Sequence, residues 1–115
     1  MVVAHKADLL GLSTCELLAR RSHLAACLGD LEQVLLGSLV EQMRRCGNVS
    51  CRCATGLAHG PYAYLSPRHR RGMKYVSSAL VVPVRACLHH GERVEAVLAE
   101  ISEINVELLA RRALT

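Results

Sequence analysis

Four sulfur and imidazole side chains fall within one short segment that is rich in turn-forming residues. They are Cys46, Cys51, Cys53 and His59. Gly47, Asn48 and Gly56 lie among them and allow the tight turns that would bring the four side chains to one point. Zinc prefers four thiolate or imidazole ligands in a tetrahedron, and three cysteines with one histidine complete such a set. The sequence therefore predicts a structural zinc ion bound by these four residues.

The spacing of the cluster is not a paired C-x-x-C arrangement, so other interpretations stay open. Cys51 and Cys53 could form a thiol switch, because the neighbouring arginines favour a thiolate. Cys53 and His59 could form a catalytic dyad, although this part of the sequence offers no acid to orient the histidine. The cysteines could also be unliganded core residues. We expect the remaining three, Cys15, Cys27 and Cys87, to fill small spaces in a helical core.

The apolar residues are aliphatic rather than aromatic. Hydrophobic residues make up 51% of the 115-residue chain, which has no Trp, no Phe and three Tyr. The core must therefore consist of Leu, Val, Ile and Ala, as in packed helices. So much aliphatic surface is difficult to bury within one small protomer, and we expect a homo-oligomer.

The first helix is predicted from a capping box and an apolar repeat. Ser13 and Glu16 have the spacing of such a box, in which each side chain satisfies a backbone N–H of the first turn. Apolar residues then recur at intervals of three, four and seven: Leu17, Leu24, Leu28, Leu31, Leu35, Leu39 and Met43. This pattern predicts a long N-terminal helix over 13–45, preceded by a flexible arm over 1–12.

The second half of the chain is expected to contain a small hairpin and another long helix. The segments 62–65 and 73–76 carry β-type residues and predict a hairpin within a Cys-rich module over 46–76. A helical region over 78–112 follows, which Gly91 could kink. The predicted fold is a mainly α single domain over 13–115. Its two long helices would pack antiparallel or across a dimer seam.

The charge distribution indicates a polyanionic partner. No Asp or Glu occurs from Gln42 to Gly91, while this segment has eight basic residues; the flanks carry ten acids and six bases, so +8 and −4 give the net charge of +4. Nucleic acid is the default candidate. A solvated basic surface is the alternative. The predicted nucleic-acid-binding residues are Arg45, Arg52, Arg68, Arg70, Arg71 and Lys74.

Tyr62 and Tyr64 are two residues apart on a predicted strand and should share one face of it. They could stack on bases while the arginines neutralise phosphates. Alternatively, they cover the metal site and hold the hairpin against the helices.

Several classes of protein are not indicated by the sequence. The uncharged apolar stretch Tyr75 to Val84 has only ten residues, whereas a membrane span needs about 20. No export signal is apparent, so we expect a cytoplasmic protein. No Gly-rich phosphate cradle, nucleophile elbow or pair of catalytic carboxylates appears, so we do not expect an enzyme.

Two motifs resemble those of a known protein family. The segments Cys46-Gly47-Asn48-Val49-Ser50-Cys51-Arg52-Cys53 and His59-Gly60-Pro61-Tyr62-x-Tyr64-Leu65-Ser66 resemble the CG-x-x-x-C-x-C and HGPY-x-YLS signature of short, uncharacterised bacterial proteins. These often occur with transposase genes and other mobile elements. The resemblance covers residues 44–112. It implies the order helix, Cys-rich hairpin, helix, and a DNA-linked context.

Two functional hypotheses follow. In the first, the chain is a zinc-stabilised and dimeric DNA-binding accessory or regulatory protein. In the second, it is a helical adaptor whose apolar stripes bind a partner such as a transposase or a transcription factor.

Overall fold

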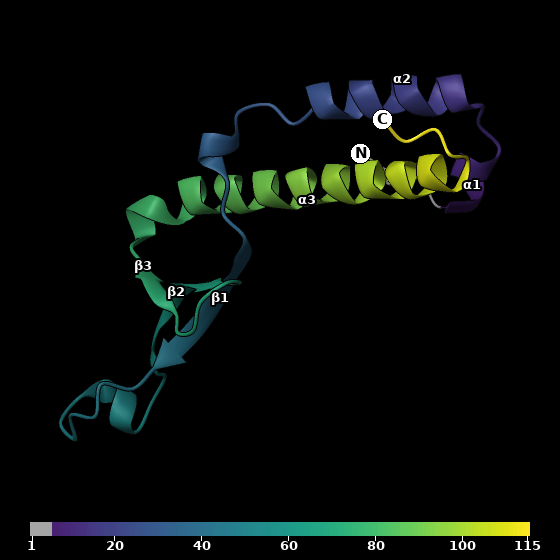
Figure 1. Ribbon diagram of the computed structural model, residues 1–115. Helices are drawn as coiled ribbons and strands as arrows, with labels where there is room; N and C mark the ends of the chain where they lie inside the picture. The colour runs from purple at the N-terminus through teal and green to yellow at the C-terminus, as the bar shows by residue number, and fades with distance from the viewer. Residues whose placement is uncertain (1–5) are drawn as a thin grey trace. The chain divides into compact units, whose positions relative to one another are not determined.

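The computed structural model describes residues 6–115 (Figure 1). Its helices and strands follow the order α1 (Lys6–Leu10), α2 (Thr14–Ala26), β1 (Gly37–Arg44), β2 (His59–Pro67), β3 (Lys74–Val76) and α3 (Val81–Ala110). Short 3-10 turns occur at Leu31–Gln33, Arg52–Ala54 and Ser78–Leu80. The described chain divides into two compact units. We call residues 6–33 with His90–Thr115 the helical unit, and Val34–His89 the sheet unit.

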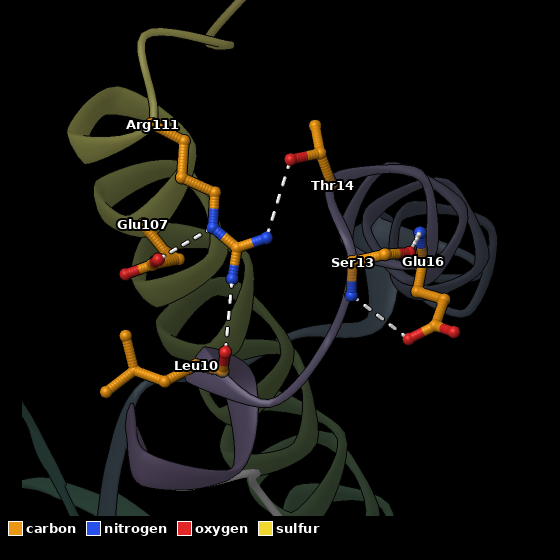
Figure 2. Close-up of polar contacts among 6 residues, drawn as sticks. All are labelled: Leu10, Ser13, Thr14, Glu16, Glu107 and Arg111. Atoms are coloured by element: carbon orange, nitrogen blue, oxygen red, sulfur yellow. Dashed lines mark hydrogen bonds and ion pairs between the residues drawn. The ribbon is translucent and has the colours of Figure 1, made fainter.

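The helical unit starts at the predicted capping box. The Ser13 Oγ accepts a hydrogen bond from the Glu16 backbone N–H at 3.1 Å, and the Glu16 Oε2 accepts one from the Ser13 N–H at 3.2 Å (Figure 2). Both bonds satisfy N–H groups that would have no partner within the helix. The box therefore fixes the first turn of α2.

Aliphatic side chains form the core of the helical unit, as the composition predicts. α2 lies alongside the C-terminal half of α3 (Figure 1), and its buried residues pack with those of α1 and α3. The core residues are Leu9, Leu17, Leu24, Val97, Ile104 and Leu108, each no more than 3% exposed. Burying a side chain of this size contributes about 1.5–3 kcal/mol. Apolar burial is thus the main source of stability in this unit.

Arg111 connects the end of α3 to the two N-terminal helices. Its guanidinium donates to the Glu107 carboxylate at 2.8 Å, to the Thr14 hydroxyl at 3.4 Å and to the Leu10 carbonyl at 3.3 Å (Figure 2). At the other end of α2, His90 of α3 contacts the Leu28 carbonyl at 3.4 Å. These contacts show that α2 and α3 run antiparallel.

A polar network crosses the middle of this helix pair. The Glu100 side chain is fully buried, and its Oε1 accepts a hydrogen bond from the Arg20 guanidinium. Arg21 donates to the Asn105 side chain at 2.9 Å. Because a buried carboxylate without a counter-charge is strongly unfavourable, Arg20 and Glu100 must face each other. The network therefore sets the register of the two helices.

The predicted helix over 13–45 is wrong, because α2 ends at Ala26 and the second half of the segment forms β1. The apolar residues explain the error. Leu35, Leu39 and Met43 are four residues apart, and an interval of four fits both the helical period and the alternation of a strand. Gly29, with φ +65°, adopts a left-handed conformation just after α2 and turns the chain out of the helix.

Gly37 is the first residue of β1, and only glycine fits there. Its φ is +150°, and a Cβ at this position would lie 2.2 Å from the Ser66 carbonyl oxygen of β2. The close approach allows β1 to pair with β2 from Gly37 opposite Pro67 to Arg44 opposite His59. Gly37 therefore starts a strand within the segment that was predicted to be helical.

Part of the predicted flexible arm is structured. Residues 1–5 of the arm lie outside the described residues. Lys6–Leu10 form α1, and Leu9 is 1% exposed within the core. This part of the arm is therefore packed, because a single buried leucine anchors it to the helix pair.

The sheet unit contains three antiparallel strands in the order β1-β2-β3, rather than the predicted hairpin alone. β3 pairs with only three residues of β2, Ala63 to Leu65. Tyr62, Tyr64 and Tyr75 lie on one face of the sheet, which we call the tyrosine face. Ala63 and Val76 are buried on the other face.

α3 is one continuous helix through Gly91, so this glycine does not break it. Pro83 is its third residue, where the missing N–H costs no helical hydrogen bond. None of the helices within residues 6–115 combines the length and apolarity needed to cross a bilayer.

We predict that Gly37→Ala lowers the free energy of unfolding of the sheet unit by about 3 kcal/mol, because the new Cβ would collide with the β2 backbone. Gly72→Ala is the matched control. It also has a positive φ, +83°, but no atom lies within 4 Å of the added Cβ, so its cost should be about 1 kcal/mol. Urea denaturation measures both. Equal destabilisation by the two variants would contradict the role of Gly37.

Candidate metal centre

The four predicted ligands lie where β1 and β2 meet. Cys46 follows the end of β1, Cys51 and Cys53 lie at the 3-10 turn Arg52–Ala54, and His59 begins β2. Arg44 pairs with His59 across the two strands, which brings the ends of the intervening segment together. We call residues 45–58 the ligand loop; Figure 1 shows it extending beyond the ends of both strands.

Local hydrogen bonds turn the ligand loop back on itself. The Asn48 side-chain oxygen accepts from the Ser50 N–H at 3.0 Å and from the Ser50 hydroxyl at 2.7 Å. The Cys51 N–H then donates to the Asn48 carbonyl at 3.0 Å. Arg45 donates to the Gly56 carbonyl at 2.9 Å and closes the loop near its base. These turns direct Cys46, Cys51 and Cys53 toward one point.

The ligand atoms lie close enough together to converge on one metal ion. All four lie within 4.8 Å of one another. The Cys46 and Cys53 sulfurs are 3.6 Å apart, and the Cys51 sulfur is 3.1 Å from His59 Nε2. Metal–sulfur bonds of about 2.3 Å in a tetrahedron imply sulfur–sulfur distances of about 3.7 Å. The donor set and its geometry therefore fit a four-coordinate metal ion.

Apolar burial does not explain the order of the ligand loop. Cys53 is 1% exposed, but Val49 and Leu57 are 92% and 91% exposed. Loops with so little buried surface are normally held by other means, such as a metal ion. Shared coordination by Cys46, Cys51, Cys53 and His59 would supply this restraint.

The close packing of sulfurs also affects their ionisation. The backbone N–H of Asn48, followed by His59, Cys53 and Cys51, stabilises the Cys46 thiolate and lowers its pKa from 9.0 to about 6. At Cys53 the Cys46 N–H favours the thiolate, but burial and the neighbouring Cys46 and Cys51 sulfurs outweigh it and raise the pKa. Ionisation of one thiol therefore disfavours ionisation of its neighbour. A divalent cation would relieve this repulsion and allow all three to ionise.

The alternative interpretations of the cluster can be compared with these contacts. The sequence suggested Cys51 with Cys53 as a thiol switch, whereas the sulfurs at 3.6 Å belong to Cys46 and Cys53. A dyad of Cys53 with His59 was the other alternative, whereas the His59 imidazole lies 3.1 Å from Cys51. The cluster shares its contacts among all four residues, which suits a metal site better than either pair.

The predicted basic residues form two groups at opposite ends of β2. Arg45 and Arg52 are exposed on the ligand loop, near the start of β2. Arg68, Arg70 and Arg71 are exposed in the connection between β2 and β3, and Lys74 is exposed at the start of β3. Arg44, which was not among the predicted contacts, lies over the Tyr64 ring with its guanidinium carbon 4.6 Å from the ring centre. The tyrosine face lies between the two groups.

The tyrosine face includes one residue, Tyr75, that the sequence did not indicate as a stacking residue. The ring centre of Tyr75 lies 6.4 Å from that of Tyr62 and 5.8 Å from that of Tyr64, both in edge-to-face arrangements. Tyr75 is 61% exposed, whereas Tyr62 and Tyr64 are half-buried. The alternation of Lys74, Tyr75 and Val76 along a strand was the signal in the sequence that could have indicated Tyr75 as a stacking residue.

Comparison with known families gives one match. The sequence model of a domain of unknown function (DUF6788) matches residues 14–86, which is more than half of the chain. The chain belongs to this family. The match includes α2, the whole ligand loop, the three strands and the first residues of α3. Comparisons with curated proteins and with solved structures give no significant match.

The other three cysteines are not core residues. Cys15 is exposed, and Cys27 and Cys87 are half-buried. The expectation that they fill a helical core is therefore wrong, because Leu and Ile occupy the buried positions of α2 and α3. All three lie outside the cluster of four candidate ligands. They serve as internal controls for the metal site.

We predict that the purified protein contains one metal ion per chain, and that Cys51→Ser or His59→Ala removes it, because three ligands bind a structural ion far more weakly than four. Elemental analysis measures the content. The control variant combines Cys15→Ser, Cys27→Ser and Cys87→Ser and should keep a full complement of metal. Metal retained by Cys51→Ser, or missing from the control, would contradict the assignment.

Proposed function

We propose that the chain is a small, zinc-stabilised nucleic-acid-binding protein that acts as an accessory or regulatory factor. DNA is the favoured ligand. The signature of the ligand loop and β2 resembles that of bacterial proteins that occur with mobile elements. This mobile-element context is part of the same proposal. The supporting observation is the position of the tyrosine face between two groups of arginines, in a segment without a single acid from Gln42 to Gly91.

Zinc is supported by the chemistry of the donor set. Three thiolates and one imidazole are soft and borderline ligands, which favour Zn²⁺ over Mg²⁺ or Ca²⁺. The site would have a net charge of −1, and Arg45 and Arg52 on the same loop would offset it. With all four positions taken by the protein, the ion would have a structural role and would hold the ligand loop against the sheet.

Nucleic-acid binding is supported by the arrangement of charge. A cluster of arginines without acids is unfavourable unless an anion neutralises it. Arg70 and Arg71 are exposed at one end of β2, and Arg45 and Arg52 are exposed at the other. A polyanion that crosses the tyrosine face would meet both groups. Phosphates would contact the arginines, and bases would contact the rings.

We further propose that the protein is not an enzyme. Four carboxylates that could serve as catalytic groups have structural partners instead. Glu16 caps α2, and the other three pair with arginines: Glu41 with Arg85, Glu100 with Arg20, and Glu107 with Arg111. A general acid or base would have to be free to contact substrate.

A helical adaptor is the second candidate, and one observation favours it. Leu98, Val106 and Leu109 of α3 are 51%, 50% and 63% exposed. Their spacing places them within one side of the helix. An exposed apolar stripe of this kind suits a second copy of the chain or a partner protein such as a transposase. Association through it would tolerate salt, unlike binding to nucleic acid.

We predict that the double variant Arg70→Gln/Arg71→Gln binds DNA more weakly and with a smaller salt dependence. Each phosphate that the variant no longer neutralises should reduce the slope of log affinity against log salt by about 0.7–0.9. Arg93→Gln/Arg112→Gln removes the same charge from the helical unit and should bind like the original protein. Fluorescence anisotropy of a labelled oligonucleotide at several salt concentrations measures this. Equal effects of the two variants would indicate non-specific attraction, and no binding at any salt would favour the adaptor.

A further inference from the structure

We infer that the metal centre is also a peroxide-sensitive switch, in which a disulfide bond between Cys46 and Cys53 takes the place of the metal ion. This inference rests on the proposed zinc-stabilised, nucleic-acid-binding function and adds a means of regulating it. Three observations carry it: the separation of the two sulfurs, the unequal exposure of the two cysteines, and the small buried surface of the ligand loop.

Cys46 and Cys53 are placed to bond with each other. Their sulfurs lie 3.6 Å apart, and the Cys46 backbone N–H donates to the Cys53 sulfur at 3.4 Å. Small rotations of the two side chains are enough to join sulfurs at this separation. The two residues are seven apart in the chain, so a bond between them would close a short ring within the ligand loop.

The cysteines of the cluster differ in their access to an oxidant. Cys46 is exposed, whereas Cys53 is 1% exposed. A redox-sensitive pair combines an accessible thiolate, which meets the oxidant, with a neighbouring thiol that resolves the product. Cys46 fits the first role and Cys53 the second. Cys51 is half-buried, and its sulfur lies 3.1 Å from the His59 imidazole. We therefore expect Cys51 to stay reduced.

The reaction balances with one molecule of a hydroperoxide, of which hydrogen peroxide is the simplest. The Cys46 thiolate attacks a peroxide oxygen and breaks the O–O bond, which yields the sulfenic acid of Cys46 and one hydroxide ion. The Cys53 thiolate then attacks the Cys46 sulfur and displaces a second hydroxide ion. The two sulfurs together lose two electrons, and the peroxide gains them.

Formation of the disulfide removes two of the four metal ligands. A metal-binding cysteine must be a thiolate, and the sulfurs of a disulfide carry no negative charge. Only Cys51 and His59 would remain, whereas a structural zinc site needs four ligands. The ion would therefore leave as the disulfide forms. A thiol reductant would reopen the disulfide by exchange, and added Zn²⁺ would refill the site.

Release of the ion would free the second half of the ligand loop. The new disulfide closes residues 46–53 only, so residues 54–58 and His59 would lose their link to the first half. Apolar burial does not replace this link, because Leu57 is 91% exposed. The hydrogen bond from Arg45 to the Gly56 carbonyl ends in the freed segment. The arginines of the ligand loop, Arg45 and Arg52, would no longer be held beside the start of β2, and DNA binding would weaken.

The test adds about one equivalent of hydrogen peroxide to the zinc-loaded protein. We expect release of about one zinc ion per chain, followed with a chromophoric zinc chelator. The matched control combines Cys15→Ser, Cys27→Ser and Cys87→Ser and leaves only the thiols of the cluster. It should release zinc to the same extent as the original protein.

Peptide mapping identifies the oxidised pair. Remaining thiols are alkylated in denaturant before digestion. Trypsin cleaves after arginine, so it leaves Cys46 and Cys51 together on peptide 46–52 and Cys53 on peptide 53–68. Mass spectrometry should find the two peptides joined by a disulfide, with the alkyl group on Cys51. An alkyl group on Cys46 would instead identify Cys51 and Cys53 as the oxidised pair and would overturn the inference.

DNA binding is measured by fluorescence anisotropy before and after oxidation. The slope of log affinity against log salt should fall by about 0.7–0.9 for each arginine of the ligand loop that no longer meets a phosphate. Dithiothreitol with Zn²⁺ should restore it. Unchanged DNA binding after zinc release would contradict the regulatory role.

The remaining outcomes separate the switch from the proposed function. Zinc that stays bound after the peroxide is consumed, or release that requires the three cysteines outside the cluster, would overturn the switch and leave the proposed function standing. A purified protein without zinc would refute both. A protein that contains zinc but binds no DNA before oxidation would refute nucleic-acid binding, and with it the regulation of that binding.

Discussion

The convergence of Cys46, Cys51, Cys53 and His59 at the end of the β1–β2 pair is the constraint on which the sheet unit depends. A fourteen-residue connection joins the two strands, and of its side chains only Cys53 is buried. Short connections keep their shape through turn chemistry, but one of this length needs an additional restraint. Four ligands on one ion would close the connection at its base. The same closure would set the position of Arg44, which lies over the Tyr64 ring of the tyrosine face.

The features that the sequence predicts well are those coded by neighbouring residues. The capping box of Ser13 and Glu16 requires two residues three apart, and the structure contains it. The four candidate ligands lie within one turn-rich segment, so their meeting point could be inferred from spacing and glycine content. Their proximity in space agrees with a metal site, while the nature of the metal remains a proposal. The long C-terminal helix agrees with the helical region predicted over 78–112, and Gly91 is too weak a signal to end it.

The features that the sequence misses depend on distant partners. β1 exists because Gly37 lets its backbone approach Ser66 of β2, and nothing in residues 27–45 alone reveals that contact. The burial of Leu9 depends in the same way on the pairing of α2 with α3. Tyr75 was overlooked because its exposure and its two ring contacts result from the register between β2 and β3. Tertiary pairing overrides local preference in each case.

The placement of the aromatic residues changes how unfolding of this protein must be measured. The helical unit has no Phe, Trp or Tyr, because all three tyrosines belong to the sheet unit. Near-ultraviolet circular dichroism therefore reports on the sheet unit alone. A loss of near-ultraviolet signal with retained helical bands is the usual criterion for a molten globule. Here the same observation would describe a disordered sheet unit in a protein whose helix pair is still well packed, so side-chain methyl resonances are the appropriate measure of order in the helical core.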